Sequence, residues 1–411
     1  MVQKIMNLKR NAWIVVLIAF FAGISLALAQ NKVVPSIVFL MEDLDISMAT
    51  AGWLSSIFCL MGMVTAIPAA FILNKFGPKV SGLIALGSTM LGSFIGVLTS
   101  SVTVLFVSRI IEGFGVGLIS VIGPALIAMW FPVAKRGLPM GIWGSWQMVA
   151  QAIIFFVGGQ LTMSYGWHGV WWFVISVCAV VAILYFWKII NPPAEYNHAD
   201  VESGTISLKD LFKTRSTWLI SIAGLLFCFS CFGFATWIAA YWSNSFHWDI
   251  NQANQWVSRL YFMEIFMVIF MGWFLDRIGR KRKMFNVVSY IFYTVILYLC
   301  FRLKNPALII PFVVIYALLE GAIPTALWTL TPQTVKDPSK VGLALGILCV
   351  GMNLGTILGP PMVGYAIEHY GWESGTLLLA ASSILGMIVM AKTKVYLPSE
   401  LEPGVQKAVA A

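Results

Sequence analysis

Long apolar stretches follow one another along most of the chain, and short polar segments separate them. A transmembrane helix needs about 20 consecutive, mostly apolar residues to cross the hydrocarbon core of a bilayer. Twelve stretches meet this requirement, and the longest polar interruption, 191–215, leaves six on each side. We expect helices at 11–39, 48–73, 79–100, 103–131, 137–162, 167–190, 216–243, 252–275, 283–302, 306–331, 341–366 and 372–392.

The pattern therefore predicts an all-α integral membrane protein with twelve transmembrane helices in two six-helix bundles. The first bundle spans 1–190 and the second spans 216–395. A central loop at 191–215 joins them, and a tail follows at 396–411.

Composition agrees with a membrane protein. The 411 residues are 59% hydrophobic and only 10% charged, whereas soluble domains carry about 25% charged residues. Soluble enzymes and disordered chains are therefore poor interpretations. The apolar stretch after Asn11 is longer than the core of a cleavable signal peptide, so we interpret it as the first spanning helix. The six cysteines lie in apolar runs and are interpreted as packing residues.

The distribution of lysine and arginine predicts an orientation. If the N-terminus is inside, the loops on the inner side hold nearly all the loop cations, and the outer loops hold only Arg302 and Lys304. This excess of positive charge is typical of the cytoplasmic side. We therefore expect both termini to be cytoplasmic, in the inner or plasma membrane of the cell. The net charge of +9 then needs no nucleic-acid partner.

Short sequences recur in the same order in the two halves, which predicts an internal repeat of the kind found in secondary transporters. The pairs are Trp13 and Trp218, Asn74–Gly77 and Asp276–Gly279, Glu112-Gly113 and Glu320-Gly321, and Tyr165–Trp167 and Tyr370–Trp372.

Two of these motifs carry a resemblance to a known family. The run 272–281, Gly-Trp-Phe-Leu-Asp-Arg-Ile-Gly-Arg-Lys, resembles the signature loop G-x-x-x-D-R-x-G-R-R of the major facilitator superfamily. The run 109–115 resembles the R-x-x-x-G-x-G motif of its fourth helix. The resemblance covers essentially the whole chain. It implies the twelve-helix fold of that family and transport by alternating access between two halves.

The loop motif also implies gating residues. Asp276, Arg277 and Arg280 would form a cluster that locks the two halves and opens when they rock, and Asn74 takes the place of the aspartate in the first-half copy. The alternative is that these cations only anchor the cytoplasmic side.

Six charged residues lie inside the predicted helices and away from their ends, where each costs about 2.5–3.5 kcal/mol on insertion scales. Lys32 lies about 12 Å below the outer end of its helix, and Arg259 lies about 10 Å below the same side, at 1.5 Å per residue. In the family fold both helices reach the central cavity. Lys32 and Arg259 are therefore predicted to clamp a small anion. The alternatives are that Lys32 extends to the outer headgroups and that Arg259 pairs structurally with Glu264.

The buried acids are candidates for proton coupling. Arg109 and Glu112 are three residues apart and share a helix face, so Glu112 could carry the coupled proton beside Arg109. The alternative is a structural ion pair. Glu264 and Glu320 lie near mid-membrane, and either could be a proton site instead.

Neutral polar and aromatic residues complete the predicted substrate site, although the aromatic ones more often pack or anchor than bind. They are Asn31, Gln147, Gln151, Asn353, Trp237 and Trp328.

Resemblances within the superfamily narrow the substrate. The run Asn31–Pro35 looks like a first-helix pattern of bacterial nitrate, nitrite and cyanate porters, but 48–73 lacks the second-helix arginine of nitrate porters. Lys32 and Arg259 are similar in placement to cations of the monocarboxylate group. The fifth-helix G-x-x-x-G-P-x-x-G-G signature of drug antiporters is absent.

We therefore expect a monomeric secondary transporter that moves a small organic anion, such as a carboxylate, by proton symport. The alternative is a proton-coupled exporter of hydrophobic or cationic compounds. A membrane sensor or scaffold has no supporting motif. No enzyme activity, metal or cofactor is expected, because neither a nucleotide-binding G-x-x-x-x-G-K-[ST] motif nor a buried histidine cluster occurs in the sequence.

Overall fold

The computed structural model describes residues 2–132, 135–190, 215–336 and 340–396. Nearly all of the predicted central loop and of the tail lies outside the described residues. Contacts divide the chain into two compact units. Unit 1 comprises 1–46, 57–202 and 250–258, and unit 2 comprises 47–56, 203–249 and 259–411.

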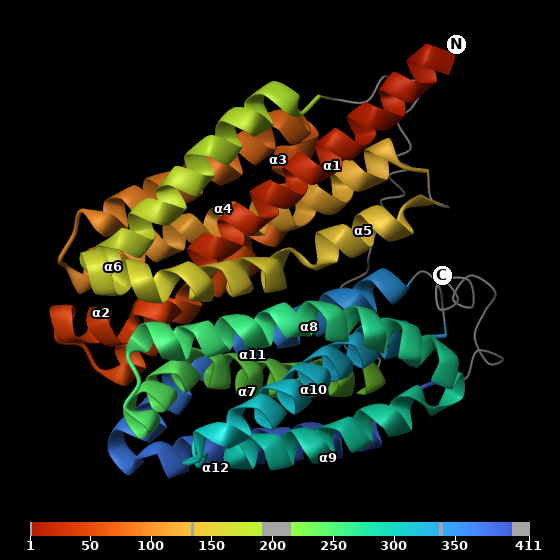
Figure 1. Cartoon of the computed structure of the whole chain (residues 1–411). Coiled ribbons are helices and arrows are strands. Elements are labelled where there is room, and N and C mark those ends of the chain that lie inside the picture. Colours follow the sequence, from red (N-terminus) through yellow and green to blue (C-terminus); the bar gives the residue numbers. More distant parts are fainter. Residues whose placement is uncertain (1, 133–134, 191–214, 337–339, 397–411) are drawn as a thin grey trace. The chain divides into compact units, whose positions relative to one another are not determined.

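Helices account for every regular element of the described chain (Figure 1). The first half contains α1 (Val2–Asn31), η1 (Val34–Ser36), α2 (Ile37–Leu44), α3 (Met48–Val97), α4 (Val102–Trp130), α5 (Gly137–Gly144) and α6 (Trp146–Lys188). The second contains α7 (Arg215–Phe246), α8 (Ile250–Ile278), η5 (Gly279–Lys281), α9 (Arg282–Cys300), η6 (Pro306–Leu308), α10 (Ile309–Leu330), η7 (Thr331–Thr334), α11 (Val341–Tyr370) and α12 (Trp372–Lys392).

Ten helical segments of the described residues are long and apolar enough to cross a membrane. Two of them, 137–188 and 250–300, contain 52 and 51 residues. At 1.5 Å per residue each is about two and a half times as long as a bilayer core is thick. The prediction of an all-α membrane protein is thus confirmed, while the count of twelve stays a prediction.

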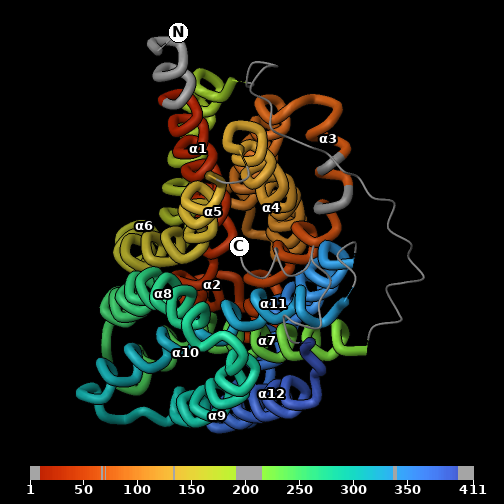
Figure 2. The backbone as a smooth tube through the Cα atoms, turned by 90° about the vertical axis from the view of Figure 1, so that its right-hand side faces the viewer, coloured from red at the N-terminus to blue at the C-terminus, as the bar shows by residue number. Residues whose placement is uncertain are grey.

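Unit 1 is built around α1, which packs against α4 and α6 (Figure 2). Small and branched apolar residues of α1, among them Val15, Ala19 and Ala22, form one cluster with Leu118 and Ile122 of α4. In unit 2, α7 packs along α11 at very short distance. A Cβ atom built on Gly355 of α11 would lie 2.0 Å from the carbonyl oxygen of Leu225. Only glycine allows the two backbones to meet this closely.

The predicted repeat is visible in the backbone. The glycines with positive φ in the described chain are Gly77, Gly166, Gly279 and Gly371, with φ of 72°, 65°, 50° and 81°. Gly77 and Gly279 follow the second helix of each half, and Gly166 and Gly371 are the glycines of the two Tyr-Gly-Trp motifs. Left-handed backbone of this kind favours glycine. The two halves therefore share their turns as well as their sequence motifs.

All six cysteines are free thiols, as expected. Cys349 is half-buried and the other five are buried.

Candidate functional site

The first helix ends within the predicted span 11–39 rather than running through it. Helix α1 stops at Asn31, Lys32 and Val33 form a turn, and η1 begins at Val34 with Pro35 in its first turn. Helix α2 resumes at Ile37. The last carbonyl groups of a helix have no intrahelical donors and carry partial negative charge. The break therefore places an electronegative helix end inside the apolar body of unit 1.

Arg109 of α4 caps this helix end. Its Nη1 donates a hydrogen bond to the carbonyl oxygen of Ala29 at 2.7 Å, and its Nη2 donates to that of Gln30 at 2.8 Å. A guanidinium group is suited to this task because its donors project as a rigid planar fork. Arg109 is fully buried, so no solvent competes for these bonds.

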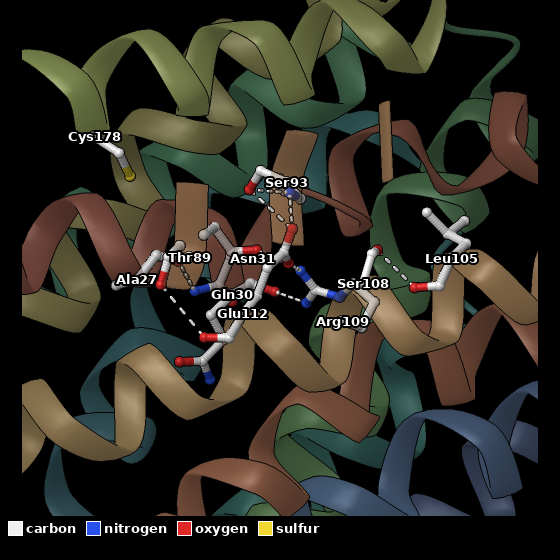
Figure 3. A network of polar contacts seen from close by, with 12 residues as sticks. Ala27, Gln30, Asn31, Thr89, Ser93, Leu105, Ser108, Arg109, Glu112 and Cys178 are labelled. Atoms are coloured by element: carbon white, nitrogen blue, oxygen red, sulfur yellow. Dashed lines mark hydrogen bonds and ion pairs between the residues drawn. The ribbon is translucent and has the colours of Figure 1, made fainter. Parts of the chain in front are cut away.

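Lys32, Arg109 and Glu112 form a closed ion cluster in unit 1, which we call the buried triad. Lys32 Nζ lies 2.5 Å from Glu112 Oε1, and Arg109 Nη1 binds Glu112 Oε2. Ser93 of α3 accepts a hydrogen bond from Lys32 Nζ and donates one to Glu112 Oε1, each at 2.8 Å. Figure 3 shows Glu112 between Ser93 and Arg109. All three charged side chains have zero exposure.

The buried triad holds two cations and one anion, so it has a net positive charge in an apolar environment. Two features besides Glu112 reduce the cost of this charge. The ring of Trp171 lies 4.5 Å from Lys32 Nζ, and the C-terminal end of α1 faces Arg109. A buried ion pair is stable only when each member is fully bonded. Chemically, the triad can bind an additional anion, or the Glu112 carboxylate can accept a proton.

Polar side chains continue from the triad along the predicted substrate site. Gln147 donates to Gln30 Oε1 at 3.0 Å, and Gln30 donates to Cys59 Sγ at 3.4 Å. Gln151 is buried in the same unit, and Asn31 Nδ2 donates to the carbonyl oxygen of Ala27. The structure therefore brings Lys32, Asn31 and Gln147 into one polar region of unit 1.

Unit 2 holds a second cluster, around the equivalent glutamate. Glu320 of α10 accepts a hydrogen bond from the Cys231 thiol at 2.8 Å and interacts electrostatically with Glu264 of α8. A Cβ on Gly321 would lie 3.1 Å from the backbone nitrogen of Val268, so α10 approaches α8 closely here. Glu264 Oε2 and Glu320 Oε2 have no hydrogen-bond partner among the described residues. Both carboxyl groups are thus available to hold a proton.

The remaining predicted substrate residues lie in unit 2. Arg259 is exposed, while Lys32 belongs to unit 1, and the clamp between them stays a prediction. Asn353 bonds to the carbonyl oxygen of Cys349. Trp237 is fully buried and donates to the carbonyl oxygen of Pro360, whereas Trp328 is 41% exposed. Trp237 therefore has the contacts of a packing residue.

The predicted gating loop has a different ion pair from the one expected. Asp276 binds Arg282 Nη2 at 3.1 Å, and Arg282 also donates to the carbonyl oxygen of Leu275. Arg277 lies over the ring of Trp273. No ion pair joining Asp276 to Arg277 or Arg280 is found in the described part of the loop. Asn74 of α3 is exposed.

Sequence reasoning missed Ser93, Trp171 and Arg282. The sequence signal for Ser93 is the pair of small residues Gly92-Ser93, because small residues in a membrane helix allow close helix packing. In the structure a Cβ on Gly92 would lie 2.6 Å from Glu112 Cγ. Trp171 had no such signal, since tryptophan is common in membrane helices.

Comparison with known proteins places the chain among transporters. A sequence model described as Major Facilitator Superfamily matches residues 15–339 and 243–409. The chain is 22% identical over 386 residues to the hexuronate transporter of Bacillus subtilis, covering 89% of this chain and 90% of that protein. It is 22% identical to the probable galactarate/D-glucarate transporter GudP of the same organism, covering 85% and 84%.

Higher identity extends over shorter stretches. The chain is 33% identical over 172 residues to an uncharacterized MFS-type transporter of Mycobacterium tuberculosis, covering 41% of this chain and 29% of that protein. Among solved structures, a D-xylose–proton symporter superposes with a TM-score of 0.72 at 16% identity, covering 93% of this chain and 97% of the other. The structural likeness concerns the fold.

Proposed function

Because the chain belongs to the major facilitator superfamily, and is a transporter rather than an enzyme, we propose that it moves a small organic anion, a carboxylate, together with a proton. The observation that carries this proposal is the buried triad, in which Lys32 and Arg109 share the single carboxylate of Glu112. Two cations held by one anion attract a second anion, and a substrate carboxylate offers the same charge and the same two oxygen acceptors as Glu112.

Coupling follows from exchange of one carboxylate for another. While Glu112 is ionised it satisfies both cations, and no substrate is needed. When Glu112 takes up a proton, Lys32 and Arg109 lose their counter-ion inside the apolar unit, which is costly unless another anion replaces it. An entering carboxylate restores the balance. Substrate and proton therefore bind together, and each favours the binding of the other.

The relatives agree with an acidic substrate. Hexuronate and galactarate, named for two relatives that match along most of their length, are carboxylates of small sugars. At 22% identity they support the chemical class and leave the particular anion open. Gln147 and Gln30, which lie beside the triad, are suited to bind hydroxyl groups of such a molecule.

Two further parts of the proposal rest on unit 2. Arg259 is proposed as the second cation for the substrate, acting with Lys32 from the other half of the chain. Glu264 and Glu320 are alternative proton sites, because each has an oxygen without a hydrogen-bond partner among the described residues.

The test uses the purified protein in liposomes that contain a pH-sensitive dye. Hexuronates, aldarates and simple monocarboxylates are added outside, followed by lipophilic cations. We expect saturable acidification of the lumen with at least one carboxylate. If no anion changes the pH of the lumen and an added cation makes the lumen more alkaline, the proposal is overturned in favour of a proton-coupled exporter.

Variants separate the roles of the triad. Lys32→Met is expected to abolish carboxylate uptake. Glu112→Gln is expected to keep exchange of internal for external substrate but to lose lumen acidification, because glutamine cannot carry the proton. Glu373→Gln is the matched control, since Glu373 forms an exposed ion pair with Arg302 at 3.8 Å and takes no part in the site. Size-exclusion chromatography verifies that each variant is folded, and Lys32→Gln/Glu112→Gln serves if the single change is unstable.

A further inference from the structure

A cavity opens in unit 1 where the first helix begins and the sixth helix ends. Its volume is about 450 Å³, and it is lined by Arg10, Asn11 and Ile14 of α1 and by Trp187, Lys188 and Ile190 at the end of α6. All six residues belong to the described part of unit 1. The cavity lies at the opposite end of α1 from the buried triad and shares no residue with it.

The cavity presents two positive charges, and no described residue provides a counter-ion for either. Arg10 and Lys188 are both exposed, and neither forms a hydrogen bond or ion pair with any described residue. A guanidinium and an ammonium group that line one cavity are the donors that proteins use for phosphate.

The rest of the lining is apolar and aromatic. Trp187 is 68% exposed and Ile190 is 43% exposed. Exposed tryptophan at the end of a membrane helix is typical of the headgroup region of a bilayer, and basic cavities between helices at this depth bind anionic headgroups. A cavity of this volume accommodates a phosphate with its glycerol, and the isoleucines and the indole ring suit the start of the acyl chains.

We propose that this cavity, formed by Arg10, Lys188 and Trp187, is a binding site for the phosphate headgroup of an anionic phospholipid. Arg10 and Lys188 hold the phosphate, and Trp187 covers the glycerol. A bound lipid joins the start of α1 to the end of α6, two helices that also pack along their length. It thereby fixes the helix whose other end forms the break at Lys32.

The test measures lipid binding by the full-length chain in detergent, and it requires no transport. Phosphatidylglycerol is added, and phosphatidylcholine is added in a parallel sample. Native mass spectrometry reports bound lipid, and a thermal melt reports protection. We expect phosphatidylglycerol to remain bound and to raise the melting temperature, and phosphatidylcholine to do neither. Each basic residue near an anionic lipid strengthens binding by about fivefold. Arg10→Gln/Lys188→Gln should therefore weaken phosphatidylglycerol binding by about thirtyfold.

The control variant is Lys75→Gln/Lys79→Gln, which removes the same charge from unit 1 outside the cavity. It is expected to bind phosphatidylglycerol as the unchanged protein does. Arg10→Lys, which keeps the charge, should retain most of the binding and remains informative if the double variant does not fold. Equal loss in both double variants would overturn the proposal, because general surface charge would then explain binding. Equal protection by inorganic phosphate would also overturn it, in favour of a site for free phosphate.

Discussion

Glu112 illustrates how one side chain can be made acceptable inside a membrane. A lone carboxylate in an apolar environment is very costly, and so is a lone ammonium or guanidinium group. Here each charge completes another: Glu112 accepts from Lys32, Arg109 and Ser93, while Arg109 uses its remaining donors on the carbonyl groups of Ala29 and Gln30. The cluster therefore depends on every member, because removing any one leaves the remaining charges without their partners in the apolar interior.

Arg109→Lys tests the capping of the broken helix. Lysine keeps the positive charge near Glu112 but cannot also reach both carbonyl groups, because it has a single nitrogen where arginine has a planar fork. Hydrogen bonds to charged groups contribute about 1.5–3 kcal/mol each. We expect a clear drop in the melting temperature of the detergent-solubilised protein.

Arg136→Lys is the matched control for that change. Arg136 likewise donates to two carbonyl groups near a helix end, those of Phe131 and Ala128, but it is only half-buried. Water can replace its lost bonds, so we expect a much smaller effect. Equal loss of stability in the two variants would contradict the role assigned to Arg109.

Part of the candidate site was predictable at this scale. The three-residue spacing of Arg109 and Glu112 predicts that they meet, and the ion pair confirms it. The suggestion that Lys32 extends to the outer headgroups is wrong, because its side chain has zero exposure and binds Glu112. Nothing local to Lys32 indicates a partner 80 residues away, since that contact depends on how α1 packs against α4.

At the scale of elements, helix existence was predicted well and helix continuity was not. Apolar length alone predicts a single helix over 11–39, whereas the chain breaks at Lys32 and continues through η1. The break is stable because other elements bind the freed backbone. Arg109 caps its near side, and Asn254 donates to the carbonyl oxygen of Pro35 at 2.9 Å. Irregular backbone at membrane depth requires such partners, and hydropathy does not report them.

The turns that join the last two helices of each half make a prediction of their own. Gly166 and Gly371 have ψ of −173° and 173° with positive φ, a region that is essentially restricted to glycine. A Cβ at either site would meet nothing within 4 Å. Gly166→Ala and Gly371→Ala should therefore each destabilise the protein by about 1–3 kcal/mol through backbone strain alone, measured by thermal unfolding in detergent.

Gly87→Ala is the control for these substitutions. Gly87 also has open space around a built Cβ, but it lies inside helix α3 with ordinary helical φ. Alanine is favoured over glycine in a helix by about 0.5–1 kcal/mol. Gly87→Ala is thus expected to leave the melting temperature unchanged or raised, and a similar loss in all three variants would exclude the strain argument.

At the scale of the whole molecule, the two halves share a framework but differ in their chemistry. The equivalent residues Glu112 and Glu320 each precede a glycine that lets a neighbouring helix approach closely. Glu112 meets two cations, whereas Glu320 meets the Cys231 thiol and Glu264. The two halves thus surround equivalent glutamates with different partners, two cations in one half and a thiol with a second carboxyl group in the other.

The orientation of the whole chain remains a prediction from its charges. Loop cations concentrate on one predicted side, and Arg302 and Lys304 are the exceptions. We expect green fluorescent protein fused to the C-terminus to fluoresce, and alkaline phosphatase fused after Lys304 to be active, because that enzyme works only outside the cytoplasm. The reverse result for both fusions would show that the termini are outside.

The burial of the cysteine thiols makes the protein suitable for site-specific labelling. No disulfide joins the described cysteines, five of them are shielded from solvent, and Cys349 alone is half-accessible. A maleimide probe should therefore leave the folded protein almost unlabelled, and Cys349→Ser should remove the residual signal. Spectroscopic labels can then be attached to cysteines introduced at chosen positions in both units, without replacing the five buried native cysteines. Distance changes during the transport cycle can thus be measured in a nearly unaltered chain.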